Sequence, residues 1–577
     1  MNKKIEKYNN ASDPIPEKQV LWPLYGAGFE NLGKDGHMIE VPVPTPGPGE
    51  LLVRHDAVGL CFSDIKVITL GQTHPRIYKD MRSDPVVLGH EVAMTVVKVG
   101  EDLKKQYQPG DRFIIQAGIF IKGVGYAYGY ELQGGLSQYT IIDQRVLNGD
   151  DGCYLLRVQP STGYAESALT EPWACVTASY SVQHRTWVKG GGTLWIVEAE
   201  GTEDRGFHFS QGLDESMHPS RVLLSHVPQA FSAWIREQAL ALGIPVEEVN
   251  DPVHPPVDLV DDIVVLGADA DLVELVSPHL AVSGVLALVT DKPFERKAQM
   301  DVGRIHYNYW TVVGGNGTDI SQAYATVPIR QGLKAGGRAW FLGAGGPMGQ
   351  MHVQRALQSL DHPGSILCTD LSDMRLQDLE TSFSAEAQSK NIEWLCLNPG
   401  KTETYQQHLQ GFQRDGFDDI VVLVPVPAII SEAADHLSPG GVMNIFAGVN
   451  RGVMASLDLN RIVFEGIRYT GQSGSSIDDL RSMLHQAEAG TLSPNRSVAA
   501  IGSLSMAKEG LLALKNATYP GKVVIFPQIK DFPLTSMPEL KEKLPTVYAR
   551  MKDGREWTVE AEEEFLQIML PGKDERI

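Results

Sequence analysis

Two short segments of the sequence carry side chains that could hold a metal ion. Cys61 lies in Gly59–Asp64, and the tripeptide Gly-His-Glu that contains His90 and Glu91 begins 28 residues after Cys61. A Glu-Pro pair further along adds a third carboxylate, Glu171. Cys, His and Glu are a reasonable ligand set for zinc, and three protein ligands with one open position are typical of a catalytic zinc site. Taken singly, each residue also has an ordinary structural role, the Cys as a buried apolar residue and the His as a core residue.

A second candidate site is a glycine-rich loop between an apolar strand, expected at 339–342, and a helix, expected at 350–359. A strand–glycine turn–helix unit directs backbone N–H groups and a helix N-terminus at a pyrophosphate. The next expected strand ends in Asp370, 21 residues after the loop, where a carboxylate can bind the ribose hydroxyls of NAD and repel the 2′-phosphate of NADP. Arg375 lies nearby and is the argument for NADP. The expected cofactor residues of the loop are Gly343, Gly345, Gly346, Pro347, Met348 and Gly349.

The second half of the chain contains an internal repeat. Asp-Asp-Ile-Val-Val-Leu begins at Asp261 and again at Asp418, an offset of 157, and this offset holds without gaps as far as Gly314 and Gly471. Alternating strands and helices in both copies predict parallel sheets. We therefore expect two tandem α/β units at about 187–320 and 334–476.

The first copy lacks the glycine-rich loop and the acidic residue that form the expected nucleotide site of the second copy. Its first strand runs into Glu198-Ala199-Glu200-Gly201, which places carboxylates where a pyrophosphate would lie, and His226 stands where the other copy has Asp370. Like charges at this position make dinucleotide binding unfavourable. The sequence predicts one working nucleotide site, in the second copy.

Composition narrows the function classes. The 577 residues suggest several domains, and 50 Lys and Arg against 71 Asp and Glu give a net charge of −21, which argues against binding nucleic acid or an anionic membrane. No apolar run reaches the roughly 20 residues of a spanning helix, and the polar N-terminus has no secretory signal. Five scattered cysteines fit thiols kept reduced, so a cytoplasmic protein is expected.

The pattern of apolar, Gly, Pro and charged residues along the chain predicts five parts. Short apolar runs separated by Gly and Pro predict a β-rich domain before the repeat, and a helix–strand pattern resumes after it. The charged C-terminal tail is expected to pack as peripheral helices, with a contact in a homodimer as the alternative. The expected boundaries are a flexible lead-in at 1–20, a β-rich catalytic domain at 21–186 completed by 493–528, a degenerate unit at 187–333, a nucleotide-binding unit at 334–492 and a helical extension at 529–577.

The segment 59–64, the Gly-His-Glu element and Pro109–Arg112 together resemble the zinc-dependent medium-chain dehydrogenase/reductase family. The polyol (sorbitol-type) dehydrogenases are most similar, because Glu171-Pro172 stands where alcohol dehydrogenases have a cysteine. The resemblance covers about 21–187 and 334–527. It implies a GroES-like catalytic domain with a Rossmann-type unit. Together with the internal repeat, this predicts an α/β plus β protein: a GroES-like catalytic domain with two tandem Rossmann-type, doubly wound parallel-sheet units, the first of them degenerate.

The resemblance also implies the roles of the site residues. Cys61 and His90 would hold a catalytic zinc, with Glu91 or Glu171 as the third ligand, directly or through water, and Ser63 would begin a proton relay. Lys66 stands where many members have a relay histidine. The four-cysteine lobe of a structural zinc is missing, so one metal ion is expected. Members carry a single Rossmann unit, and we hypothesise that the extra copy here joins the active copy edge to edge in one continuous sheet.

The expected reaction is hydride transfer between NAD and a secondary alcohol of a polyol, sugar or related hydroxylated metabolite of carbohydrate metabolism. The alternatives are a metal-free NAD(P)-dependent reductase of the same superfamily and a non-catalytic binding or scaffold protein derived from such an enzyme. A phosphorylated substrate would need basic residues near the site. Arg76, Lys79 or Arg82 could supply them, although charges of this kind are more often solvated loop residues.

Overall fold

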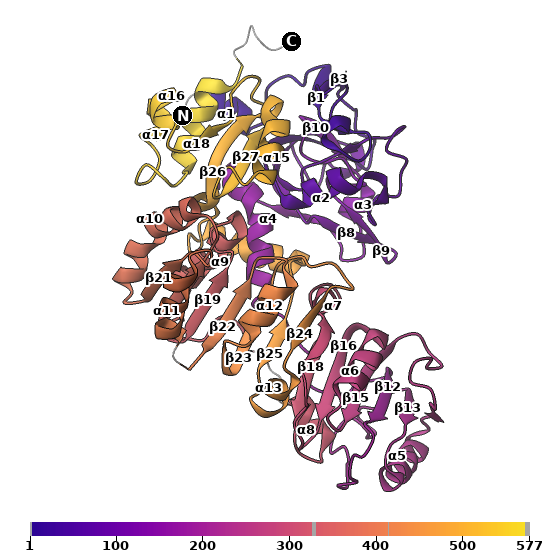
Figure 1. Cartoon of the computed structure of the whole chain (residues 1–577). Coiled ribbons are helices and arrows are strands. Elements are labelled where there is room, and N and C mark those ends of the chain that lie inside the picture. The colour runs from indigo at the N-terminus through magenta and orange to yellow at the C-terminus, as the bar shows by residue number, and fades with distance from the viewer. Residues whose placement is uncertain (1–2, 326–329, 414, 572–577) are drawn as a thin grey trace. The chain divides into compact units, whose positions relative to one another are not determined.

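The computed structural model describes residues 3–325, 330–413 and 415–571. They form two compact units (Figure 1). None of the helices in these residues is both long and apolar enough to cross a membrane. The first unit comprises Met1–Thr177, Gly346–Met351 and Ser475–Ile577, and the second comprises Ala178–Gly345 and His352–Gly474.

The first unit is built on an eight-stranded sheet whose centre is the antiparallel pair β4 (Leu51–Gly59) and β6 (Glu91–Val99). Every residue of β4 is buried, as expected for a strand covered on both faces. The register pairs Gly59 with Glu91, so the chain leaves β4 toward Cys61 beside the point where it enters β6. The strand order is β11 (Leu155–Arg157), β7 (Arg112–Ile115), β6, β4, β27 (Lys522–Phe526), β26 (Val498–Ser503) and β28 (Thr535–Ser536), with β10 (Tyr139–Ile142) also paired to β4.

The first and the last described helices pack on this unit. Interpreting residues 1–20 as a flexible lead-in is wrong, because α1 (Lys3–Asn9) buries Ile5 and Tyr8 in an apolar cluster shared with the C-terminal helices. The Tyr8 hydroxyl donates to Asp56 at 2.6 Å. The described helices of the tail contribute residues such as Leu540, Val547 and Phe565 to the same apolar cluster, and β28 adds a short strand to the sheet. Its helices are α16 (Leu540–Lys543), α17 (Pro545–Tyr548) and α18 (Val559–Met569).

The second unit contains two six-stranded parallel sheets with the same strand order, which confirms the predicted α/β class (Figure 1). Both sheets show a register shift at the Asp-Asp motif, between Val260 and Asp262 and between Phe417 and Asp419. The first sheet runs β14 (Val246–Glu248), β13 (Arg221–Ser225), β12 (Thr193–Glu198), β15 (Val260–Leu266), β16 (Leu280–Val289), β18 (Thr311–Gly315). The second runs β21 (Glu393–Leu397), β20 (Ser365–Thr369), β19 (Arg338–Leu342), β22 (Phe417–Val422), β23 (Leu437–Ile445), β25 (Arg468–Thr470).

Helices follow the strands in both copies. In the first copy they are α5 (Gln229–Leu242), α6 (Ala270–Val276), α7 (Val302–Tyr307) and α8 (Ile320–Ala325). In the second they are α9 (Pro347–Gln358), α10 (Asp373–Ser389), α11 (Thr402–Gln413), α12 (Pro427–Ala434) and α13 (Leu459–Phe464).

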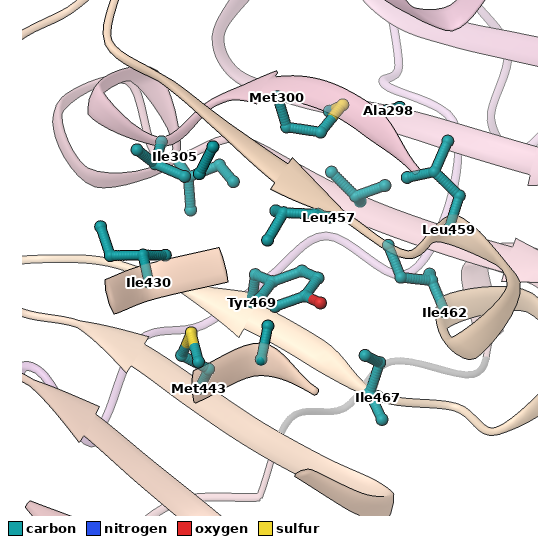
Figure 2. Packing of buried hydrophobic residues seen from close by; sticks show 14 of the residues in the cluster. Ala298, Met300, Ile305, Ile430, Met443, Leu457, Leu459, Ile462, Ile467 and Tyr469 are labelled. Atoms are coloured by element: carbon teal, nitrogen blue, oxygen red, sulfur yellow. The ribbon is translucent and has the colours of Figure 1, made fainter. Parts of the chain in front are cut away.

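The two copies are joined by the antiparallel ladder of β17 (Ala298–Asp301) and β24 (Met454–Leu457). Gln299 pairs with Ser456, its own equivalent at the offset of 157, so the ladder is symmetric about this pair. The copies also share one apolar core, in which Figure 2 shows Met300 near Leu457. The two nucleotide-fold units therefore pack around a local two-fold relationship.

The hypothesis of one continuous sheet is wrong, because no ladder connects edge strands β18 and β25 among the described residues. Two equivalent glycines lie instead against helices of the other copy. A Cβ on Gly314 would lie 2.8 Å from Val463 of α13, and one on Gly471 would lie 2.8 Å from the Cα of His306 of α7. This close packing and the β17–β24 ladder hold the copies together, while the edge strands of the two sheets do not pair.

Candidate active site

The structure brings Cys61, His90 and Glu91 together in the first unit. One ligand atom from each of the three side chains lies within 4.8 Å of the others, and no other group of this kind occurs in the residues that the structure describes. His90 and Glu91 are buried, and Cys61 is half-buried. The pairing of β4 with β6 creates the cluster, since it fixes the residues just after β4 beside the first residues of β6.

Asp64 organises the backbone of this cluster and lies beside its imidazole, although no hydrogen bond forms with His90 Nδ1. Its Oδ2 accepts from Cys61 N at 3.0 Å, its Oδ1 accepts from Gly89 N at 3.3 Å, and Oδ1 lies 3.4 Å from His90 Nδ1. Cys61 is the N-cap of α2 (Phe62–Leu70), so the thiol lies at the start of a helix. Burial lowers the pKa of His90, but Asp64 and Cys61 oppose it and leave that pKa well above its ordinary value.

Lys522 is a member of the site that the sequence did not reveal. Its Nζ lies 2.5 Å from Glu91 Oε1 and donates to Leu60 O at 2.9 Å, and both charged side chains are buried. Burial lowers the pKa of Lys522, but Glu91 and Cys61 raise it above its ordinary value. The other carboxylate oxygen of Glu91, Oε2, is buried and has no hydrogen-bond partner. The only signal in the sequence was an isolated lysine at the start of the apolar strand β27.

Glu171 lies outside the three-ligand cluster but close to it. It is buried in α4 (Tyr164–Ala178), and Cys175 Sγ donates to its Oε1 at 3.8 Å. Burial raises the pKa of Glu171 to about 7, with His90 lowering it and Glu91 raising it. Of the two carboxylates proposed as third ligand, the geometry groups Glu91 with the thiol and the imidazole.

Ser63, the expected start of a proton relay, lies in the first turn of α2 and hydrogen-bonds to Tyr130. The Tyr130 ring packs edge-on against His90, with ring centroids 5.9 Å apart. Burial raises the pKa of Tyr130 to about 12, so the phenol stays protonated near neutral pH.

The glycine-rich loop follows β19, as expected, and α9 begins at Pro347. Gly345 N donates to Asp370 Oδ2 at 3.1 Å, and a Cβ on this glycine would lie 2.5 Å from the Cβ of Arg375. Only glycine fits there. Gly343 has a positive φ of 79°, which glycine adopts without strain. Gly346, Pro347, Met348 and Gly349 form the turn into α9 and its first residues.

The corresponding crevice of the first copy is acidic. A cavity of about 570 Å³ lies beyond the carboxyl ends of β12, β15 and β16, lined by six carboxylates and three basic side chains. Burial and Asp204 raise the pKa of Glu198, at the end of β12, to about 7. His226 has a positive φ of 55° directly after β13. The excess of carboxylates over basic side chains makes this cavity unfavourable for a pyrophosphate.

The three basic residues of the loop before Gly89 differ in environment. Lys79 Nζ forms an ion pair with Asp84 at 3.3 Å, and Arg82 is exposed. Arg76 is half-buried and donates from Nη2 to Tyr126 O at 2.7 Å.

Comparison with known proteins places this architecture in a family. Residues 47–148 match the family model "Alcohol dehydrogenase GroES-like domain". Mannitol-1-phosphate 5-dehydrogenase of Aliivibrio fischeri is 30% identical over 314 residues, 49% of this chain and 72% of that protein. L-sorbose 1-phosphate reductase of Klebsiella pneumoniae is 22% identical over 90% of this chain and 92% of its own length.

Among solved structures, 2R,3R-butanediol dehydrogenase of Bacillus subtilis superposes with a TM-score of 0.52 at 15% identity. The match spans 88% of this chain and 99% of that one, which shows a shared fold. The GroES-like match and the mannitol-1-phosphate 5-dehydrogenase relative together show that the chain belongs to the medium-chain dehydrogenase/reductase family.

Proposed function

We propose that the protein is a zinc-dependent, NAD-linked dehydrogenase that interconverts a secondary alcohol of a polyol or sugar with the corresponding ketone. The observation that carries the proposal is the convergence of a thiol, an imidazole and a carboxylate within 4.8 Å. Membership of a dehydrogenase family supports hydride transfer as the reaction class.

The three side chains fit one zinc ion. In tetrahedral geometry, bond lengths of about 2.3 Å to sulfur and about 2.0–2.2 Å to nitrogen and oxygen place the ligand atoms of one ion about 3.3–3.7 Å apart. The three ligand atoms lie within 4.8 Å of one another, so a shift of about 1 Å would bring them to these separations. The buried Glu91 Oε2 without a hydrogen-bond partner is an atom that such an ion would satisfy. Cys61, His90 and Glu91 would hold the ion, and Glu171 would lie beside it. Bound there, zinc would supply Lewis-acid chemistry that lowers the pKa of an alcohol oxygen.

The protein's own groups hold the ligands and move the proton. The carboxylate of Asp64 lies 3.4 Å from His90 Nδ1, and Lys522 donates to Glu91. Groups that contact the ligands of a metal in this way orient them. Ser63 accepts the alcohol proton in the proposed relay and passes it outward, with the hydroxyl of Tyr130 as its neighbour. Because that phenol stays protonated, it acts as a hydrogen-bonding partner and not as a base.

We assign the cofactor site to the second α/β unit. Backbone N–H groups of the Gly343–Gly349 loop would bind the pyrophosphate, and the carboxylate of Asp370, held by Gly345 N, would meet the ribose hydroxyls. A 2′-phosphate would face this negative charge, which favours NAD over NADP. Arg375 packs against the same glycine and is the group that could offset the repulsion.

Two relatives support a proposal for the substrate class. A mannitol-1-phosphate 5-dehydrogenase and an L-sorbose 1-phosphate reductase both act, by name, on phosphorylated six-carbon polyols or sugars. We propose the same class here.

The test is to assay the purified protein for NADH formation with mannitol 1-phosphate, sorbitol 6-phosphate, mannitol and sorbitol, before and after zinc is removed by a chelator. We expect turnover that is lost on zinc removal and restored by zinc. Turnover that survives complete zinc removal would instead identify a metal-free reductase. A protein that binds neither NAD nor zinc would be the non-catalytic alternative.

A further inference from the structure

Two cysteines lie side by side in the sheet of the second copy. The parallel strands β20 and β21 are neighbours, and their register pairs Cys368 with Cys396. Side chains at paired positions of parallel strands leave the sheet on the same face, so the two thiols are adjacent. Cys368 is buried, and Cys396, on the edge strand, is half-buried. Burial raises the pKa of the Cys368 thiol, with smaller contributions from a hydrogen bond with Cys396 and from the charge of Cys396.

The spacing of the two strands suits a disulfide bond. Neighbouring strands lie about 4.7–4.9 Å apart, and the Cα atoms of disulfide-bonded cysteines are usually about 4.4–6.8 Å apart. The Cβ atoms of an in-register pair are separated by about the strand spacing, whereas a disulfide brings them to about 3.8 Å. A bond between Cys368 and Cys396 is therefore compatible with the fold, but it draws β20 and β21 together by about 1 Å at this position.

The cysteine pair lies next to the carboxylate that we assign to the ribose of NAD. Asp370 comes two residues after Cys368, and its backbone N–H donates at 3.3 Å to the carbonyl of Leu397, the residue after Cys396. Asp370 Oδ2 in turn accepts from Gly345 N of the glycine-rich loop at 3.1 Å. All five residues belong to the second unit. A contraction between β20 and β21 at the cysteines therefore displaces the backbone and the carboxylate of Asp370.

The first copy has other residues at the two equivalent positions. Trp195 of β12 is equivalent to Trp340 of β19, and the strand registers that start from them place Leu224 opposite Glu248 where the second copy has the two cysteines. Glu248 forms an ion pair with Arg236. The cysteine pair therefore occurs in the copy that carries the expected nucleotide site and not in its degenerate equivalent.

Oxidation of the pair by hydrogen peroxide has a plausible order. A thiolate is the reactive form of cysteine, and the raised pKa of the buried Cys368 disfavours it there. The more accessible Cys396 sulfur therefore attacks the peroxide, which gives a sulfenic acid and water. The Cys368 sulfur then displaces the hydroxyl group of the sulfenic acid, which leaves with the Cys368 proton as a second water. The two thiols lose two electrons and two protons, and one peroxide is reduced to two waters.

We propose that Cys368 and Cys396 form a reversible disulfide when hydrogen peroxide is the oxidant, and that this bond lowers the affinity of the second copy for NAD. The effect on NAD rests on the proposed function, whereas formation of the disulfide does not. Both cysteines are free thiols in the structure, which is the state that binds the cofactor. A thiol reductant opens the disulfide by exchange and restores that state.

The experiment treats the full-length, zinc-loaded protein with hydrogen peroxide. Peptide mass spectrometry maps the disulfide, and fluorescence titration measures the dissociation constant of NADH without a substrate. We expect a Cys368–Cys396 link and a dissociation constant raised roughly tenfold or more, the loss expected when a hydrogen bond to a charged group is broken. Dithiothreitol should reverse both. Cys396→Ser should keep its NADH affinity after peroxide, and Cys153→Ser, a half-buried cysteine of the first unit, should respond as the wild type does.

The absence of a Cys368–Cys396 link after peroxide, or an equal loss of NADH affinity in Cys396→Ser, would overturn the proposal. A disulfide that leaves the NADH affinity unchanged would refute its effect on the cofactor site. If the reduced protein binds no NADH but the disulfide still forms, the modification site stands and the dehydrogenase proposal fails. A reduced protein that oxidises sorbitol 6-phosphate with NAD but forms no disulfide would have the opposite meaning.

Discussion

Lys522 and Glu91 form a buried ion pair, 2.5 Å between Nζ and Oε1, between the C-terminal strand β27 and the first residue of β6. Lys522 also donates to the carbonyl of Leu60, the residue before the candidate ligand Cys61. The pair thus links a carboxylate and a thiol of the proposed zinc site to a strand more than four hundred residues further along the chain. Its strength depends on both partners, because an isolated buried charge is unfavourable.

The first prediction concerns this ion pair. Lys522→Met should lower the free energy of unfolding of the zinc-free protein by about 3–5 kcal/mol, because it leaves the carboxylate of Glu91 buried without a counter-charge. Zinc would supply that positive charge, so adding zinc should raise the melting temperature of the variant more than that of the wild type. Thermal unfolding with and without zinc measures both effects.

The matched control is Lys530→Met, which removes an exposed lysine just after the same strand. The double variant Lys522→Met/Glu91→Gln removes both charges and should be more stable than Lys522→Met alone. If zinc stabilises Lys522→Met no more than it stabilises the wild type, Glu91 does not contact the metal.

The second prediction concerns the choice of cofactor. Asp370→Ser should raise the affinity for NADP relative to NAD about ten- to hundredfold, because it removes a negative charge from the expected position of the 2′-phosphate. Fluorescence titration with both reduced cofactors measures this ratio without a substrate. Asp373→Asn, an exposed neighbour at the start of α10, should leave it unchanged. An unaltered ratio in Asp370→Ser would place the adenosine ribose elsewhere.

The third prediction is a pH dependence of stability set by Glu166 in the first turn of α4. Burial, with a smaller contribution from Glu562, raises the pKa of Glu166 to about 7, against 4.5 for an ordinary glutamate. The folded state therefore binds more protons than the unfolded state between these values, and stability must fall as pH rises through this window. At pH 8 the resulting loss is at most about 3 kcal/mol.

Glu166→Gln should therefore raise the free energy of unfolding at pH 8 and make little difference at pH 4, as measured by urea denaturation. Glu560→Gln changes an exposed glutamate of α18 and is the control. A variant whose stability keeps the same pH slope as the wild type would show that the side chain of Glu166 ionises freely in the folded protein.

The two α/β units could be predicted from the sequence because the same residues recur at equivalent positions in both copies. Asp261 and Asp418 are the first residues of the repeated hexamer. Asp261 forms an ion pair with Lys189, and Asp418 forms one with Lys334, both at 2.6 Å. The contacts between copies were not predictable in the same way. The sequence shows that Gly314 and Gly471 are equivalent. Only the three-dimensional structure shows that each packs against a helix of the other copy and that the edge strands β18 and β25 form no ladder.

A metal site at Cys61 and His90, with Glu91 or Glu171 as third ligand, was expected from the resemblance to the dehydrogenase family, and the pairing of β4 with β6 brings Cys61, His90 and Glu91 together. Lys522 was not expected, because it reaches Glu91 only through the pairing of β27 with β4 at the far end of the chain. Dependence on contacts between residues far apart in the sequence also explains why residues 1–20 were wrongly expected to be flexible. The seven residues of α1 are too few to form a stable helix alone and are held by buried contacts such as Tyr8 with Asp56.

The zinc content of the purified protein and of two ligand variants tests the central claim most directly. Elemental analysis should find about one zinc per wild-type chain, as a three-ligand catalytic site predicts. Cys61→Ser and His90→Ala should lose zinc and dehydrogenase activity while they bind NAD with nearly unchanged affinity. Full zinc content or full activity in either variant would contradict the assignment of Cys61, His90 and Glu91 as the catalytic metal site.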